Sequence, residues 1–298
     1  MVPAALATEL IGISEGLRLA GRTPADCVDL LRGVTDSLAS QRPVVALKQS
    51  LRDAGIDWEG DAFERMLLYH ALEDSAPRID ALPVHPAVKL LIRKEFQRFA
   101  SAPGSATRSV LVETDPFVAA SKICTLRRFP SGPLDWVVSG MPRSWLLNIP
   151  PRESFFALRF IFLEFGGLKP AFYVHVAHPP RNRALIIEKE VRRSYYRMAC
   201  SLAMQPGIKG IMCASWFHDP AALEDYPHLA AVNEPYLNLG GRIVTTLGPA
   251  PVESGFLKHN AERRERYQRG EWKPRTALAM WPREAALAWM RAHPELEA

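Results

Sequence analysis

Two histidines stand three residues apart, at His175 and His178, and histidine is the side chain whose charge changes near neutral pH. An imidazole here can act as a general base that removes the proton of an attacking amine. His178 is the stronger candidate, because it comes where the chain reaches Pro179-Pro180 and must leave a strand. The alternative is a strand-end histidine whose nitrogens bond to the backbone.

A second polar group stands at the end of a nearly unbroken apolar run at 208–216. It contains Ser215, Trp216, His218 and Asp219. Ser215 could donate a proton to a leaving thiolate, since strand ends are common ligand positions. Asp219 stands directly before Pro220 and is better explained as the N-cap of a helix.

Regular elements must position these two groups. Alternation over 171–178 predicts a strand with Phe172, Val174 and Val176 on one face and Tyr173 and His175 on the other. A long helix is expected at 184–204, and a strand buried on both faces at 208–216. A helix from 220 and a strand at 241–247 complete the series.

The order of these elements over residues 171–250 resembles the second half of the GNAT acyltransferase superfamily, and the local sequence resembles its bacterial members. The resemblance implies that the pantetheine arm of acyl-CoA lies between two splayed central strands, beside Val176 and Trp216. It also implies a pyrophosphate at the start of the following helix, where backbone N–H groups favour anions. No permanently bound cofactor is implied, since acyl-CoA or an acyl carrier protein would serve as co-substrate.

The phosphate loop departs from the family pattern. The superfamily has Q/R-x-x-G-x-G/A, whereas this chain has Pro180-Arg181-Asn182-Arg183-Ala184, without glycine. Backbone approach to a pyrophosphate is harder without glycine, so Arg181 and Arg183 would have to act as side-chain clamps. We therefore expect an N-acyltransferase that uses a CoA or acyl-carrier-protein thioester and a small-molecule amine, with His178, His175 and Ser215 as catalytic candidates.

A metal-dependent oxygenase is an alternative function, since two histidines and a carboxylate suit non-haem iron. The available ligands are His175, His178, His218, His228, Glu188 and Glu190. No H-x-D/E pair with a distant histidine occurs, and H-x-x-H on a strand places its histidines on opposite faces. We expect no metal.

A third function class would use the basic segment 258–275, which has seven Lys or Arg and three Glu. Four of the chain's five excess positive charges fall there (37 Lys and Arg against 32 Asp and Glu), and the sequence pI is about 9.1. This segment could bind an anion or nucleic acid. A solvated helix with internal Glu–Arg pairs explains it more simply, so we expect no nucleic-acid partner.

The first hundred residues show helical periodicity throughout, with a helix start at Thr23-Pro24-Ala25-Asp26. We expect a helical subdomain at 1–105, a boundary near 101–109, and a sheet domain at 106–298 that ends in the basic helical segment. Further strands are expected at 110–112, 134–139 and 145–149, and 153–165 fits a helix or a strand. The predicted class is α+β, with α/β-like features: a helical subdomain, then a GNAT-like mixed sheet with flanking helices.

Composition limits the compartment. The 298 residues are 48% hydrophobic and 23% charged, which excludes fibrous and wholly disordered chains. The four cysteines form no C-x-x-C pair, so a zinc ribbon or redox motif is not expected. No membrane span is predicted, since the most hydrophobic stretch, 155–168, contains Arg159 and Glu164. No signal peptide is predicted, since residues 1–19 contain Glu9 and Glu15 and lack a leading positive charge. We expect a cytoplasmic protein with no membrane partner.

Overall fold

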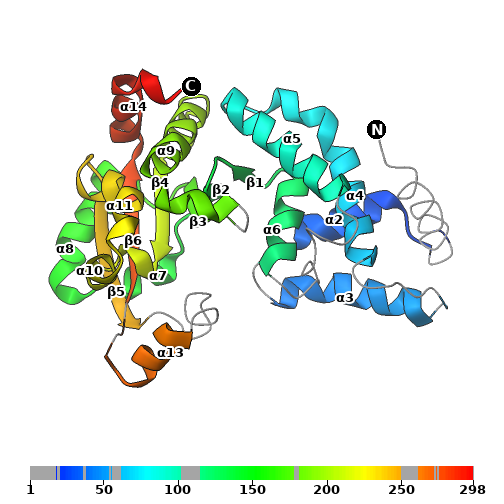
Figure 1. Cartoon of the computed structure of the whole chain (residues 1–298), viewed down its shortest axis with the longest axis horizontal. Helices are drawn as coiled ribbons and strands as arrows, with labels where there is room; N and C mark the ends of the chain where they lie inside the picture. Colours follow the sequence, from blue (N-terminus) through cyan, green and yellow to red (C-terminus); the bar gives the residue numbers. More distant parts are fainter. Residues whose placement is uncertain are drawn as a thin grey trace. The chain divides into compact units, whose positions relative to one another are not determined.

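The computed structural model describes residues 18, 21–35, 38–53, 55, 62–101, 115–177, 181–249, 261–271, 273 and 275–297. The chain divides into two compact units (Figure 1). The first comprises Met1–Leu82 and Pro86–Pro130, and the second comprises Pro83–His85 and Ser131–Ala298. The expected boundary near 101–109 falls almost wholly outside the described residues, so the division at residue 105 stays a prediction.

The first unit is helical. Its helices are α2 (Pro24–Gly33), α3 (Leu38–Asp53), α4 (Ala62–Ser75), α5 (Pro86–Ser101) and α6 (Asp115–Cys124), with a 3-10 helix at Ala76–Ala81 and the short strand β1 (Arg128–Pro130). Thr23 and Asp26 form the predicted capping box, because the Asp26 N–H donates to the Thr23 hydroxyl and the Thr23 N–H donates to the Asp26 carboxylate. Leu31, Phe63 and Phe117, from three helices, lie in one fully buried core.

The second unit is built around a mixed sheet. Its strands are β2 (Leu134–Ser139), β3 (Ala171–Val176), β4 (Gly210–Ser215), β5 (Arg242–Pro249) and β6 (Arg275–Pro282). The strand order of the whole sheet is β1-β2-β3-β4-β6-β5. Only the β3–β4 pair among the pairings of β2 to β6 is parallel; the others are antiparallel.

Helices cover both faces of this sheet (Figure 1). These helices are α7 (Arg143–Leu147), α8 (Pro151–Arg159), α9 (Glu188–Ala203), α10 (Pro220–Asp225), α11 (Ala230–Leu237) and α14 (Arg283–Ala292). Helix α13 (Ala261–Gln268) lies beyond the end of β5 (Figure 1). A π-helix, Phe160–Glu164, continues α8, and short 3-10 helices lie at Arg181–Ile186, Trp216–His218, Pro227–Leu229 and Pro294–Leu296.

Each face has its own core. On one face, Phe160 and Ile161 of the π-helix pack with Met212, Leu278 and Met280 of the sheet. On the other face, Tyr195 of α9 contacts the rings of Tyr236 and Trp281, and Trp281 contacts Trp289 of α14. The sheet is therefore buried on both sides, and the predicted α+β class is confirmed.

Three predictions of local structure need correction. Residues 145–149 are not a strand. Trp145 and Leu146 belong to α7, and their side chains pack against the hydrophobic core on one face of the sheet. The long helix does not begin at 184, because Arg181–Ile186 is a 3-10 helix and α9 begins at Glu188. Strand β6 was not expected at all, although it lies between β4 and β5. Residues 153–165 are helical, while the strand expected at 110–112 lies outside the described residues.

Candidate functional site

The parallel strands β3 and β4 are aligned for only part of their length. Phe172 pairs with Ile211 and Tyr173 with Met212, and the last three residues of each strand form no aligned pair with the other. The neighbouring ladders, β2–β3 and β4–β6, each have six aligned pairs. The sheet is thus regular on both sides of a central interruption, which lies at the carboxyl ends of its two parallel strands.

Side chains take the place of backbone donors at this interruption. The Cys213 thiol donates to the Val174 carbonyl oxygen (Sγ···O 3.3 Å). The Tyr173 hydroxyl reaches from β3 to the Ala214 carbonyl oxygen of β4, at 3.5 Å. That distance is long for a hydroxyl donor, so the Tyr173 bond is weak and readily exchanged for another acceptor.

His175 lies on the same sheet face as Tyr173, as alternation predicted. The two rings meet edge to face, with centroids 4.7 Å apart, and Trp145 of α7 lies 5.8 Å from Tyr173 on the other side. His175 is half-buried and stands opposite Asp135 in the β2–β3 ladder. The structure therefore places this imidazole against the ring of the tyrosine whose hydroxyl spans the interruption.

Ser215 ends β4 on the opposite face. It pairs with Ala277 and shares its face with Cys213, whereas His175 shares the face of Met212 and Ala214. Its hydroxyl is half-buried and makes no hydrogen bond to another described residue. His175 and Ser215 therefore do not meet on one face. His178, the preferred base, lies outside the described residues.

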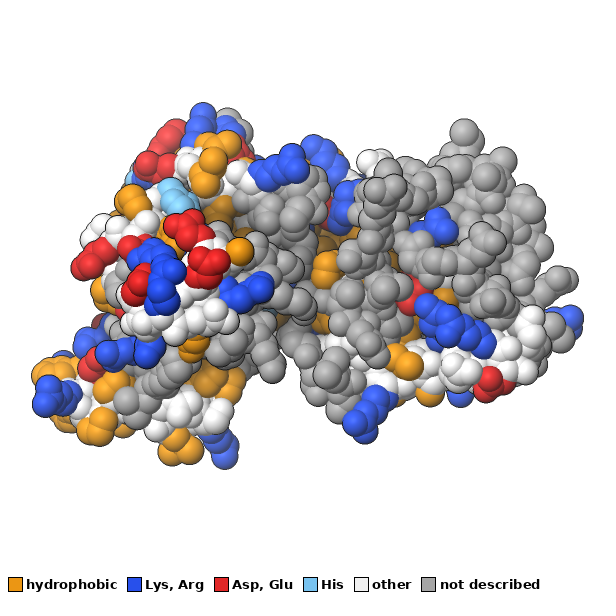
Figure 2. Space-filling view, turned by 60° about the horizontal axis from the view of Figure 1, so that its bottom comes forward, with side chains coloured by type: hydrophobic (Ala, Val, Ile, Leu, Met, Phe, Trp, Pro, Cys, Tyr) orange, Lys and Arg blue, Asp and Glu red, His pale blue; other side chains and the backbone are white. Residues whose placement is uncertain are grey.

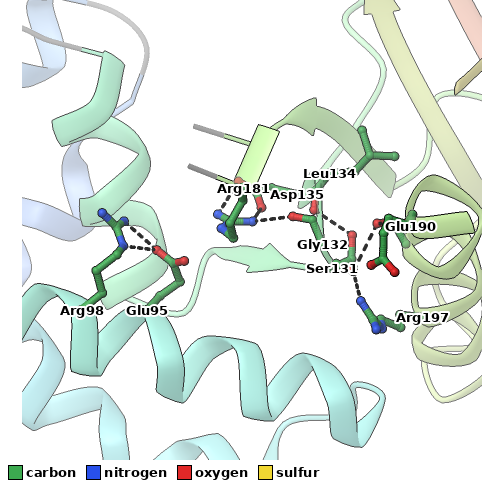
Figure 3. Close-up of polar contacts among 10 residues, drawn as sticks. Glu95, Arg98, Ser131, Gly132, Leu134, Asp135, Arg181, Glu190 and Arg197 are labelled. Atoms are coloured by element: carbon green, nitrogen blue, oxygen red, sulfur yellow. Dashed lines mark hydrogen bonds and ion pairs between the residues drawn. The ribbon is translucent and has the colours of Figure 1, made fainter. Parts of the chain in front are cut away.

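Arg181 is held by a buried carboxylate (Figure 3). Its two Nη groups form a fork on Asp135, with Nη2 3.2 Å from Oδ2, and Nη1 also donates to the Gly132 carbonyl oxygen at 2.9 Å. The Asp135 side chain is fully buried. Since a buried carboxylate without a partner is costly, most of this guanidinium's hydrogen bonding is committed to the protein.

The turn that Arg181 contacts is also bound from α9. Arg197 donates to the Ser131 carbonyl oxygen at 2.6 Å, and Ser194 donates to the same oxygen at 3.2 Å (Figure 3). Gly132 in this turn has φ +141°, and a Cβ there would stand 2.6 Å from the Ser194 hydroxyl oxygen. The close approach of α9 therefore requires glycine at this position.

The other predicted cofactor contacts are more open. Arg183 is exposed and forms no hydrogen bond or ion pair with another described residue. Val176 is half-buried and pairs with Leu134. Helix α9 begins with Glu188 and Glu190 in its first turn, and these carboxylates oppose an anion at that helix end.

Trp216 forms part of an aromatic clamp. The Arg263 guanidinium lies 5.4 Å from the Trp216 ring and 4.5 Å from the Tyr226 ring, and its Nε donates to the Tyr226 hydroxyl at 3.1 Å. Arg266 pairs with Asp225 at 3.1 Å. The basic helix α13 is thus fastened beside the end of β4 by two of its arginines, while Arg269 makes exposed ion pairs with Glu265 and Glu271.

His218, which the sequence placed in the strand-end group and among the possible metal ligands, is a buried neutral imidazole. Asn233 donates through Nδ2 to the Phe217 and Leu229 carbonyl oxygens, so its Oδ1 faces the histidine and accepts from Nδ1 at 2.7 Å. Nε2 therefore carries the lone pair, and it has no hydrogen-bond partner among the residues that the structure describes. Burial lowers the pKa of His218 to about 4, which keeps the ring neutral at physiological pH.

Asp219 connects the start of α10 with β6. Its carboxylate accepts a hydrogen bond from the backbone N–H of Arg275, at the start of β6. The main-chain oxygen of Asp219 accepts from Ala222 and Leu223 in the first turn of α10. Within the described part of the chain, no three His, Cys, Asp or Glu side chains gather closely enough to hold a metal ion.

Sequence reasoning missed the residues that bridge elements. Tyr173 was placed on the correct face, but nothing local indicated that its hydroxyl reaches β4. The aromatic neighbours of Arg263 were visible only as isolated residues 37 and 47 positions away. One usable signal was the Trp-Phe-His sequence at 216–218, which directly follows an apolar strand and favours burial of the imidazole.

Comparison with known proteins gives low similarity. No protein-family model matches the chain, and no curated protein matches it. Three solved structures resemble it at low scores. An acyltransferase in complex with CoA and 10C-teicoplanin is 12% identical (TM-score 0.38; 74% of this chain and 67% of that one covered). An acyltransferase in complex with decanoyl-CoA is 11% identical (TM-score 0.35; 82% and 88% covered).

An acyltransferase mutant in complex with octanoyl-CoA is 16% identical (TM-score 0.33; 87% and 88% covered). Similarity at these scores does not establish a common fold. The chain's own geometry must therefore support any assignment of function.

Proposed function

We propose that the protein is an acyltransferase that moves an acyl group from a CoA or acyl-carrier-protein thioester to an amine. One observation carries this proposal: the β3–β4 ladder stops after Tyr173 and Met212 although both strands continue. In the superfamily that residues 171–250 resemble, the pantetheine arm lies between two such strands.

The interruption suits pantetheine chemically. Each strand keeps its hydrogen bonds to its outer neighbour, β2 or β6, and no aligned pair joins β3 to β4 beyond Tyr173 and Met212. Backbone N–H and C=O groups along a strand edge can bond to an extended ligand. Each of the two amides of a pantetheine arm has one N–H donor and one C=O acceptor, as a peptide group has. The arm can therefore lie between β3 and β4 and bond to their backbones as an additional strand would.

The reacting groups are proposed from the face that carries His175. The amine nitrogen attacks the thioester carbonyl carbon, and an imidazole, His175 or His178, takes the amine proton. The C–S bond then breaks, and the leaving thiolate takes a proton from a hydroxyl. Tyr173 suits this second role better than Ser215, because its hydroxyl lies at the interruption and on the face of His175.

The phosphates are proposed to lie near Arg183. This guanidinium is exposed and without a partner among the described residues, whereas Arg181 would have to leave Asp135 to bind a phosphate. We therefore propose that Arg183 contacts the phosphates directly, and that Arg181 holds the segment around residue 181 against Asp135 and Gly132. Side-chain clamping also fits a loop without glycine and a following helix that begins with glutamates.

Calorimetric titration tests the proposal. CoA, acetyl-CoA, a longer acyl-CoA and an acylated carrier protein are titrated into the full chain, and binding of at least one is expected. Ala214→Phe places a ring beside the interruption and should weaken that binding at least about tenfold. Val138→Phe, at an exposed residue of β2, is the matched control and should not change it. Absence of binding by every thioester would refute the assignment.

A further inference from the structure

The solvent side of α8 and its π-helical continuation is strongly apolar. Phe155 is 71% exposed, Phe156 56%, Phe162 53% and Leu163 75%. We call these four residues the α8 apolar face. The inward side of the same segment is apolar as well, because Ala157, Phe160 and Ile161 are buried against the sheet. A short helix that is hydrophobic on both sides is missing a covering surface.

Basic side chains lie within this face. Arg152 and Arg159 stand at positions i and i+7 relative to one another, with Phe155 and Phe156 between them at i+3 and i+4, so all four lie on one side of the helix. Both arginines are exposed, and neither forms a hydrogen bond or ion pair with another described residue. Figure 2 shows hydrophobic side chains beside Lys and Arg at the left of the view, the side on which Figure 1 labels α8.

The acidic residues of the segment stand next to this face. Glu153 is half-buried, and Glu164 is exposed at the end of the π-helix, directly after Leu163. The surface is therefore apolar and cationic together, which is the composition of helices that lie in a membrane interface: aromatic and aliphatic groups enter the acyl boundary while arginines reach the phosphates.

We propose that the α8 apolar face binds the surface of a bilayer that contains anionic phospholipid. The four apolar side chains enter the interfacial layer, and Arg152 and Arg159 contact lipid phosphates. This departs from the sequence expectation of no membrane partner, and it concerns a surface only: among the described residues no helix is long and apolar enough to cross a membrane.

Charge argues against a second copy of the chain as the partner. A two-fold pairing through this face would bring Arg152 and Arg159 of one copy against the same arginines of the other, and no acidic group at the centre of the face would offset them. A bilayer with negative headgroups supplies both the apolar layer and the opposite charge.

Flotation with vesicles tests the proposal on the full chain. Phosphatidylcholine vesicles are compared with vesicles of phosphatidylcholine and phosphatidylglycerol. We expect the protein to float with the second kind only, and less at high salt. Phe156→Ser with Phe162→Ser, and separately Arg152→Gln with Arg159→Gln, should each lower the bound fraction about tenfold or more.

Matched control variants distinguish binding through the α8 apolar face from non-specific binding to vesicles. Leu90 and Leu237 are 52% and 56% exposed, so L90S/L237S removes similar exposed apolar area elsewhere and should bind as the wild type does. R42Q/R291Q removes two exposed arginines elsewhere and should also bind. No flotation by the wild type, equal loss in the controls, or a wild-type dimer that F156S/F162S dissociates would each overturn the proposal.

Discussion

Tyr173 of β3 and Met212 of β4 form the last aligned pair between the two parallel strands at the centre of the sheet. Beyond this pair, the Tyr173 hydroxyl and the Cys213 thiol reach carbonyl oxygens of the facing strand. Both are weak bonds, since one is long and the other uses a poor donor. The centre of the sheet is therefore closed by groups that a bound ligand could replace.

Tyr173→Phe tests the proton donor in the proposed reaction. Removing the hydroxyl should lower kcat by about a hundredfold, because a positioned acid contributes on that scale. The affinity for the thioester should change little, since the ring and its contacts with His175 and Trp145 remain. Steady-state kinetics with calorimetry would measure both quantities.

Tyr267→Phe, at a half-buried residue of α13, is the control and should leave kcat unchanged. A Tyr173→Phe enzyme with full kcat would remove Tyr173 from the mechanism and return the role to Ser215.

The pair Arg181–Asp135 should matter for folding, because the carboxylate is fully buried and the arginine is only 16% exposed. Arg181→Ala should lower the free energy of unfolding by about 3–5 kcal/mol, since it removes the ion-pair partner of a buried carboxylate. Arg181→Met together with Asp135→Leu should recover much of that loss, because it removes both charges and keeps the volume. Urea unfolding of Arg181→Met, Asp135→Leu and their double variant gives the coupling directly. Additive losses would show that the pair is not coupled.

Gly132 and Gly207 offer a matched pair of substitutions. Gly132→Ala should destabilise the protein by about 1–3 kcal/mol, because the residue has φ +141° and the new Cβ would meet Ser194. Gly207→Ala meets no atom within 4 Å and should be neutral or slightly stabilising. Thermal unfolding compares the two, and equal losses would contradict the close packing of α9 on the 131–134 turn.

His218 should make stability depend on pH. Burial lowers its pKa from 6.5 to about 4 in the folded state, so below pH 6.5 the unfolded chain binds a proton that the folded chain does not. The free energy of unfolding should therefore fall as the pH drops from about 6.5 towards 4, by about 3 kcal/mol from this group. His218→Gln should flatten this part of the profile in urea unfolding across pH 4–7.5.

His228 is exposed, so His228→Gln is the control and should keep the wild-type profile. An unchanged slope in His218→Gln would show that other groups, mainly paired carboxylates, cause the acid sensitivity.

The amino-acid sequence by itself determined the features that depend on near neighbours. The capping box of Thr23 and Asp26, the strand at 134–139 and the two faces of β3 follow from contacts or alternation within a few residues. Three features depended on distant partners. Strand β6 is rich in alanine and methionine, with little intrinsic preference for a strand, and it is extended because β4 and β5 pair with its two edges.

Residues 145–149 read as an apolar strand, yet α7 forms there because Trp145 and Leu146 pack on the sheet. The candidate site was decided in the same way. Local pattern located His175, Ser215 and Arg181, but only the register between β3 and β4 sets His175 and Ser215 on opposite faces. Only the tertiary structure brings Asp135 next to Arg181, so that the arginine pairs with a buried carboxylate. Such contacts join residues about forty or more positions apart. Contacts over that distance do not produce a periodic pattern in the sequence, so local sequence patterns do not predict them.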